Sequence, residues 1–250
     1  MKASLVHSSH VSVAHSLAAA RIDRYLLERT AGSGLQEPRR SVRTRVRPVI
    51  TISRTLGVPA EEIAARLARD LGFHVFDREV LEAVAQDAHL AGRIIESLDT
   101  GKQSALDAWI RGCLGLFHPI LDPRGFRHMV CRVIRGISLH GSAVIIGRGA
   151  NFILRGGDAF RVRLTAPVDL RVRAVMAAEG SGLAPAEARR RIRQHNDERR
   201  KFMKKHFRAD IDAPAAYDAV FNLRSLEPDL AAGLIEDIYR RTFGEQEGGR

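Results

Sequence analysis

Five short apolar runs, separated by stretches with helical spacing, constrain the fold of this 250-residue chain more than any other feature. An apolar run without polar alternation is typical of a strand that is buried on both faces. Strands that alternate with helices form a parallel sheet, because a parallel connection needs a long crossover. The pattern therefore predicts an α/β fold with a doubly wound, parallel, five-stranded sheet. The expected strands are 49–53, 73–76, 143–147, 160–166 and 219–223.

The composition along the chain predicts one globular domain after a basic tail. The domain is expected over 48–245, since the segment before Pro48 has a linker-like composition rich in arginine. Residues 1–47 are expected to be a flexible tail with one short helix near 15–29. Residues 91–140 predict a helical insertion of two or three helices. The other helices are expected over 59–72, 77–88, 167–178, 185–207 and 228–243.

The net charge of +11 is concentrated in two segments. Residues 1–48 hold nine Lys/Arg against three Asp/Glu, and residues 189–208 hold ten against two, so the rest of the chain is slightly acidic. Segments of this kind favour a concentrated negative charge, either a polyphosphate in a site or a nucleic acid along a surface.

No stretch approaches the ~18 consecutive apolar residues of a membrane span. Three histidines, His7, His10 and His15, interrupt any signal-peptide core in the first twenty residues. We therefore expect a cytoplasmic protein without a membrane partner. The oligomeric state is left open.

Residues 49–67 predict a strand, a short loop and the start of a helix, which is the layout of a phosphate-binding loop. Gly57 would let the backbone approach a phosphate, and the helix dipole would attract it. However, the loop has no lysine, Pro59 removes an N–H donor, and Glu61 places a negative charge at the helix start. Two interpretations remain open: an altered phosphate site or an ordinary strand–helix turn.

Charged residues follow the second and third expected strands, at the carboxyl edge where such sheets bind ligands. Asp77 can help to orient Mg²⁺ and Arg78 can meet a phosphate; alternatively, Asp77 caps the next helix and forms a local ion pair. Arg148, between Gly147 and Gly149, can bind an acceptor phosphate through both arms of its guanidinium.

The basic helix expected over 185–207 places Arg193, Asp197 and Arg200 on one face. A mobile lid that carries arginines can stabilise the charge on a transferring phosphoryl group and exclude water. We expect such a lid over 184–210. The alternative is a solvated helix whose ion pairs contribute a few tenths of a kcal/mol each.

Seven segments of the expected domain carry a resemblance when they are read in order. They are Ile50-Thr-Ile-Ser-Arg, Glu62-Ile-Ala-Ala-Arg-Leu-Ala-Arg-Asp-Leu-Gly-Phe, Phe76-Asp-Arg-Glu, Val144-Ile-Ile-Gly-Arg-Gly-Ala-Asn-Phe-Ile-Leu, Arg161-Val-Arg-Leu-Thr-Ala-Pro-Val-Asp-Leu-Arg-Val-Arg, Asn196-Asp-Glu-Arg-Arg and Tyr217-Asp-Ala-Val-Phe-Asn. Together, over about residues 49–240, they resemble the cytidylate kinase-like family, a divergent branch of the P-loop nucleoside monophosphate kinases.

The resemblance implies a P-loop NTPase-like fold, ATP–Mg²⁺ as the donor and a nucleoside monophosphate, often a cytidine nucleotide, as the acceptor. The candidate catalytic residues are Arg193, Asp197 and Arg200. The candidate ATP-binding residues are Ser53, Arg54, Gly57, Ala60 and Glu61, with the usual lysine position near Ala60 and the magnesium-binding hydroxyl near Glu61. The candidate substrate-binding residues are Asp77, Arg78, Arg148 and Arg171, and Asp77 is the one candidate for Mg²⁺.

Three functions follow from these patterns. The leading hypothesis is a phosphotransferase that moves a phosphoryl group from ATP–Mg²⁺ to a nucleoside monophosphate or a similar small acceptor. The alternative is a catalytically degenerate nucleotide-binding or regulatory protein of the same fold, because Val58, Pro59 and Glu61 replace residues of a flexible cradle. The third is a basic nucleic-acid-binding protein, which the two cationic segments suggest but the absence of interleaved aromatic residues does not favour.

Overall fold

The computed structural model describes residues 15–28, 47–116, 125–154, 157–179 and 182–244. The chain forms two compact units. The first unit comprises Met1–Arg47 and Phe76–Ser142, and the second comprises Pro48–Val75 and Ala143–Arg250. Among the helices in the described ranges, none is both long enough and apolar enough to cross a membrane.

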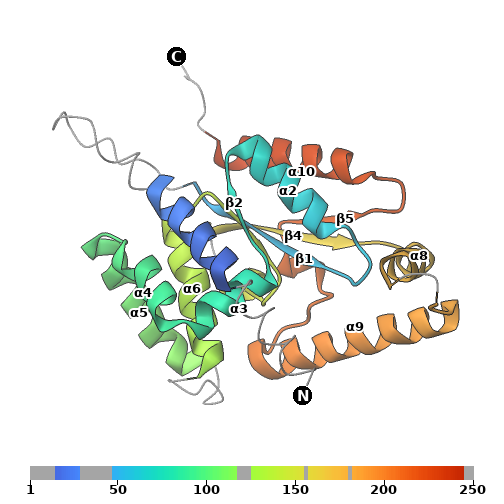
Figure 1. The fold of residues 1–250 in the computed structure, drawn as a ribbon, viewed down its shortest axis with the longest axis horizontal. Helices are drawn as coiled ribbons and strands as arrows, with labels where there is room; N and C mark the ends of the chain where they lie inside the picture. Colours follow the sequence, from blue (N-terminus) through green and yellow to red (C-terminus); the bar gives the residue numbers. More distant parts are fainter. Residues whose placement is uncertain (1–14, 29–46, 117–124, 155–156, 180–181, 245–250) are drawn as a thin grey trace. The chain divides into compact units, whose positions relative to one another are not determined.

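The second unit is built on a five-stranded sheet with the order β2-β3-β1-β4-β5 (Figure 1). Strand β1 pairs in parallel with both β3 and β4, and β4 pairs in parallel with β5, so the predicted parallel sheet is confirmed. The last residue of β2 is counted with the first unit. The strands are β1 (Val49–Arg54), β2 (His74–Phe76), β3 (Ala143–Ile146), β4 (Ala159–Thr165) and β5 (Ala219–Asn222).

One face of the sheet is the hydrophobic core of this unit. Residues alternate between the two faces of a strand, which directs Ile50, Ile52 and Val162 to the same side. There they pack with α2 (Ala60–Leu71) and α10 (Pro228–Phe243), which lie together on that side in Figure 1. The periodic apolar residues of α2 end at Gly72, whose φ of 66° suits a glycine at a helix C-terminus.

The opposite face of the same strands is polar. Thr51, Ser53 and Arg163 alternate with the core residues of β1 and β4, and each is at most 6% exposed. Ser53 lies beside Arg163 in the ladder. This arrangement brings a buried charge to the carboxyl end of the central strands.

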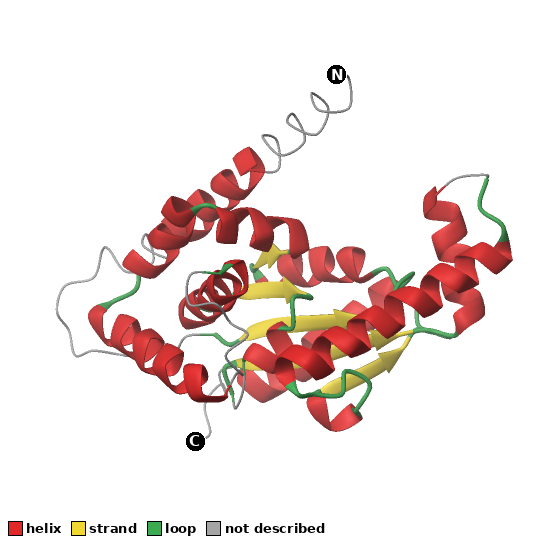
Figure 2. Ribbon diagram, turned by 90° about the horizontal axis from the view of Figure 1, so that it is seen from below, coloured by secondary structure: helices red, strands yellow, loops and turns green. Residues whose placement is uncertain are grey.

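Four further helices complete the second unit: α7 (Ala150–Ile153), α8 (Val168–Glu179), α9 (Pro185–Phe207) and the 3₁₀ helix η1 (Pro214–Ala216). Helix α9 begins with a proline in its first turn, as its sequence predicts. Its Ile192 packs on Val172 and Val175 of α8, while its Met203 packs with Phe152 and Ile211. In Figure 2, which views the unit from below, α9 crosses the sheet.

The first unit is helical. It contains α3 (Arg78–Gln86), α4 (Ala88–Glu96), α5 (Thr100–Leu116) and α6 (Phe126–His140), and the last three confirm the predicted helical insertion. A helix over 15–28 packs within this unit: Ile22 and Tyr25 are fully buried. The hydroxyl of Tyr25 donates to the carbonyl oxygens of Ile137 at 3.1 Å and Gly141 at 2.8 Å.

Residues 15–28 therefore differ from the flexible tail that we expected over 1–47. The physical reason is the apolar face of this helix, whose buried residues also include Ala18 and Leu26. The rest of the expected tail, 1–14 and 29–46, lies outside the described residues.

Candidate functional site

The loop after β1 is a tight turn. Gly57 has a φ of 84°, and a Cβ at this position would lie 2.7 Å from the carbonyl oxygen of Arg171. Val58 is 6% exposed and belongs to the hydrophobic core. The glycine is thus required by the close contact of two backbone segments, and Val58 anchors the loop.

At the start of α2, Pro59 lacks a backbone donor and Ala60 uses its own within the loop. Pro59 has no N–H, and its φ of −77° and ψ of 58° form an inverse γ-turn in which the N–H of Ala60 donates to the carbonyl oxygen of Val58 at 2.8 Å. The exposed carboxylate of Glu61 accepts from Arg54 at 2.7 Å. This geometry fits an ordinary strand–helix turn better than an open phosphate cradle.

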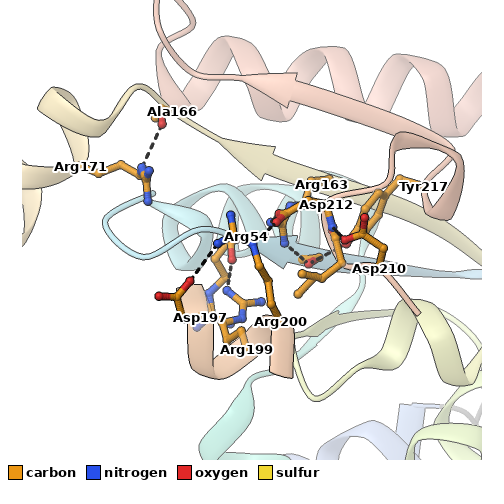
Figure 3. A network of polar contacts seen from close by, with 12 residues as sticks. Arg54, Arg163, Ala166, Arg171, Asp197, Arg199, Arg200, Asp210, Asp212 and Tyr217 are labelled. Carbon is orange, nitrogen blue, oxygen red and sulfur yellow. Dashed lines mark hydrogen bonds and ion pairs between the residues drawn. The ribbon is translucent and has the colours of Figure 1, made fainter. Parts of the chain in front are cut away.

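Beside this turn, four guanidinium groups lie together at the carboxyl end of β1 and β4, and a fifth, that of Arg171, lies to one side and is influenced by the charge of Arg163; we call the five the arginine cluster (Figure 3). They come from four elements that are far apart in the sequence: β1, β4, α8 and α9. The members of the arginine cluster are Arg54, Arg163, Arg171, Arg199 and Arg200.

Asp212 links two members of the cluster. Its carboxylate accepts from Arg163 at 2.8 Å through one oxygen and from Arg200 at 2.6 Å through the other. Arg163 also donates to the hydroxyl oxygen of Ser53 at 2.8 Å, and its guanidinium lies 5.7 Å from the centre of the Tyr217 ring. Ser53 therefore serves to fix Arg163, which is a role that the sequence did not indicate.

Two members of the cluster bond no carboxylate among the described residues. Arg171 donates to the carbonyl oxygen of Ala166 at 2.9 Å, and Arg199 donates to the carbonyl oxygen of Arg54. Arg171 is 6% exposed, and its Nη1 is buried without a partner in the described part of the chain.

The electrostatics of these two side chains reflect their lack of a bonded carboxylate, although the charge of Asp212 partly offsets the effect at Arg199. Desolvation, together with the positive charges of Arg163 and Arg54, lowers the pKa of Arg199 to about 10. Desolvation and the charge of Arg163 also lower the pKa of Arg171. Both groups remain cations at neutral pH. A desolvated cation without a counter-charge opposes folding, which makes such a group a candidate for binding an anion.

The loop after β3 touches the arginine cluster. Three successive residues of this loop have a left-handed backbone conformation: φ is 80° at Gly147, 51° at Arg148 and 71° at Gly149. A Cβ on Gly147 would lie 3.0 Å from the Nη1 of Arg54. A run of left-handed residues can direct backbone N–H groups toward an anion. Gly147 thus permits the approach of Arg54 and Gly149 that of the Phe207 ring, while Arg148 itself is half-buried.

The remaining predicted residues of α9 and α8 have distinct environments. Arg193 is exposed, and Asp197 is an exposed partner of Arg200 at 3.1 Å. On α8, Arg171 is buried and Arg173 is exposed, so the two point to different faces of the helix.

Asp77 and Arg78 belong to the first unit. Asp77 caps α3 by accepting from the N–H of Val80 at 2.9 Å, and it also accepts from Arg21 at 3.4 Å. Arg78 is exposed and pairs with Glu82 at 3.0 Å. The predicted capping role of Asp77 is confirmed.

Sequence reasoning missed Arg163, Arg199 and Asp212. A signal for Arg163 existed, because a strand that reads Arg-Val-Arg-Leu places its arginines on one face and its apolar residues on the other. No comparable signal separates Arg199 from its neighbour Arg200, since both belong to a helix that is basic on most sides.

The described residues suit a phosphate better than a metal ion. Within them, no group of three or more His, Cys, Asp or Glu is placed to hold a metal. The described carboxylates that bond the cluster are already paired with arginines: Glu61 with Arg54, Asp197 with Arg200, and Asp212 with Arg163 and Arg200.

Comparison with known proteins points to one family. The model of the cytidylate kinase-like family matches residues 49–225. Among solved structures, an uncharacterized protein from Eubacterium ventriosum ATCC 27560 has a similar fold, with a TM-score of 0.61 at 18% identity; the match covers 78% of this chain and 99% of that chain. A shikimate kinase from Bacteroides thetaiotaomicron gives a TM-score of 0.45 at 16% identity and covers 78% and 97%. No curated protein matches the chain.

Proposed function

Because the chain belongs to the cytidylate kinase-like family, we propose that it is a phosphotransferase that moves a phosphoryl group from ATP to a nucleoside monophosphate or a similar small acceptor. Family membership supports a nucleotide kinase-like function in general. The choice of ATP as donor and of a nucleoside monophosphate as acceptor is our proposal.

The observation that carries the proposal is the arginine cluster, in which Arg171 and Arg199 bond backbone carbonyls and no described carboxylate. Guanidinium groups match phosphate oxygens through paired N–H donors. The cluster lies at the carboxyl end of the central strands, where open α/β sheets bind ligands. An ATP phosphate chain would supply the negative charge that these two side chains lack.

The chemistry needs charge stabilisation more than covalent participation, because phosphoryl transfer spreads negative charge over the oxygens of the transferring group. In this proposal, Arg171 and Arg199 hold the donor phosphates, and Arg148 binds the acceptor phosphate. Preorganised cations in a site of low polarity stabilise such charge more strongly than water does. Asp212 keeps two of the guanidiniums in place.

Two predicted catalytic residues take a secondary place in this proposal. Arg200 is held by Asp197 and Asp212, so it would have to exchange a carboxylate for a phosphate to act. Arg193 is exposed and bonds no member of the cluster in the described contacts. The family suggests that Mg²⁺ accompanies the nucleotide, where it would neutralise phosphate charge. The described carboxylates do not form a site for it, so we assign no step to the metal.

The test is the transfer of label from γ-³²P-ATP to a panel of nucleoside monophosphates, measured for the wild-type chain and for Arg199→Met. We expect a labelled nucleoside diphosphate from at least one acceptor and a loss of about 100-fold or more in kcat/KM for the variant, which is typical when a group that stabilises the transition state is removed. Lys201→Met is the matched control, since Lys201 is an exposed cation on the same helix. No product with any acceptor would contradict the proposal.

A second function has its own support in the loop after β1. The buried Val58, the γ-turn at Pro59 and the Arg54–Glu61 pair leave few backbone donors for a phosphate. These features favour a protein that binds nucleotide without transferring phosphate. Calorimetric binding of ATP by a protein that yields no product in the transfer assay would select this function.

A further inference from the structure

We infer that the arginine cluster takes the nucleotide as its metal-free polyphosphate anion, so that binding does not require a divalent cation. The inference rests on the proposed nucleotide function and concerns the ionic form of the ligand at the same site. It follows from the balance of charges around the cluster, from the ion pairs that occupy the described carboxylates bonded to it, and from the buried Nη1 of Arg171, which has no partner in the described part of the chain.

The cluster carries a surplus of positive charge. Its five guanidiniums are bonded by three carboxylates, which belong to Glu61, Asp197 and Asp212. The surplus resides on Arg171 and Arg199, whose described partners are backbone carbonyls. A polyphosphate site with one lysine relies on Mg²⁺ to neutralise the remaining phosphate charge. Here the protein itself supplies cations for that purpose.

The described carboxylates that bond the cluster could not take a magnesium ion without breaking an ion pair. Mg²⁺ in nucleotide sites is usually held by one or two carboxylates together with phosphates and waters. Asp212 bonds two arginines at 2.6 and 2.8 Å, and Glu61 bonds one at 2.7 Å. The metal would also lie among cations that repel it. The free anion, in contrast, presents its full negative charge to the guanidiniums.

The buried Nη1 of Arg171 strengthens this assignment. This nitrogen has no hydrogen-bond partner in the described part of the chain, although the side chain is 6% exposed. Its helix also approaches the loop at Gly57, where the two backbones are in contact. A phosphate oxygen at this nitrogen would satisfy a donor that folding leaves unpaired.

Calorimetry on the full-length protein tests the inference with two probes, ATP and inorganic tripolyphosphate, each in EDTA and in excess Mg²⁺. We expect both probes to bind in EDTA, with dissociation constants equal to or lower than those in Mg²⁺. Tripolyphosphate separates recognition of the phosphates from recognition of the nucleoside. Binding of ATP that occurs only with Mg²⁺ would overturn the inference.

A pair of variants on α8 locates the binding. Arg171→Met should weaken both probes in EDTA by about tenfold or more, as expected for a charged hydrogen bond to phosphate. Arg173→Met is the control, because Arg173 is an exposed arginine two residues away on the same helix. Equal affinities for the two variants, both folded by circular dichroism, would exclude Arg171 from the site.

The outcomes also separate this inference from the proposed function. A protein that binds ATP in EDTA but transfers no phosphate supports the inference and contradicts phosphotransfer. A protein that transfers phosphate and binds ATP only with Mg²⁺ supports phosphotransfer and contradicts the inference. Absence of binding under both conditions contradicts both.

Discussion

Arg199 illustrates how one side chain can oppose folding and favour binding. Its desolvation and its cationic neighbours lower its pKa, and its described hydrogen bond goes to a backbone carbonyl rather than a carboxylate. Charged groups that are removed from water without a counter-charge destabilise the folded state. The same property keeps the guanidinium available for an anionic ligand.

We therefore expect Arg199→Met to leave the free energy of unfolding unchanged or to raise it by about 1 kcal/mol, because a methionine of similar length replaces an uncompensated cation. Urea denaturation without ligand measures this change. Added ATP should stabilise the wild type and not the variant. A variant that unfolds far more easily than the wild type would show that Arg199 serves the fold.

Gly57 is the residue of the β1–α2 loop with the least freedom to change. In Gly57→Ala, an alanine would have to adopt a φ of 84°, and its Cβ would lie 2.7 Å from the carbonyl oxygen of Arg171. We therefore expect a loss of about 1–3 kcal/mol in the free energy of unfolding. Gly233→Ala is the control: no atom lies within 4 Å of its added Cβ, and a helical alanine should stabilise by about 0.5–1 kcal/mol. Similar melting curves for the two variants would refute the close contact at Gly57.

The sequence predicted several site residues for reasons other than those that the structure reveals. Gly57 was expected to approach a phosphate, yet it meets the backbone of Arg171. Ser53 was expected to bind ATP, yet its hydroxyl accepts from Arg163. Spacing in a sequence identifies residues that share a face, but it does not identify their partners across the fold, and partners decide these roles.

Helix α9 is the element whose extent the sequence described well, whereas the partners of its charges became visible only in the structure. Its predicted bounds, 185–207, agree with the structure because a proline starts it and Arg208, with a φ of 50°, ends it. Its charges were expected to present a cationic face. Instead, many of them are paired: Arg190 with Glu187, Arg191 with Glu179, and Arg200 with Asp212. This pairing reduces the charge that the helix offers to a nucleic acid.

Asp212 joins α9 to β4, so its neutralisation tests how these elements are held. Asp212→Asn should lower the free energy of unfolding by about 1–3 kcal/mol, because Arg163 stays buried without its carboxylate. It should also tighten ATP binding, since Arg163 and Arg200 are released. Asp237→Asn removes an exposed ion pair on α10 and should change stability by less than about 0.5 kcal/mol. Equal effects of the two substitutions would contradict this account.

At the scale of the whole chain, the sequence predicted the strands, the helices and the parallel sheet, but not the order of the strands or the division into two units. The order of the strands depends on which strands pair and which surfaces pack across the fold. The apolar pattern is similar in every central strand, so it does not identify the neighbours of any one of them. The two units combine segments from distant parts of the sequence, such as the helix over 15–28 with α3 to α6. Local patterns carry no information about such pairings.

Hydrogen exchange with and without ATP tests which unit takes part in binding. All members of the arginine cluster belong to the second unit, so we expect slower exchange around Arg54, Arg171 and Arg199. The amide of Val80, which donates to Asp77, should be unaffected. Slower exchange at this amide would instead assign Asp77 and Arg78 to the ligand site.

In the carboxyl-terminal halves of β1 and β4, one face of the sheet is apolar and the other carries polar and charged side chains. Neighbouring positions of β1 and β4 are therefore under opposite constraints during evolution. Ile52 and Val162 can exchange for other aliphatic residues and retain the fold, whereas Ser53 and Arg163 must retain their hydrogen-bonding groups. Tolerance to substitution should alternate residue by residue in this part of β1 and β4, so that a gain of hydrophobicity is harmless at one position and deleterious at the next.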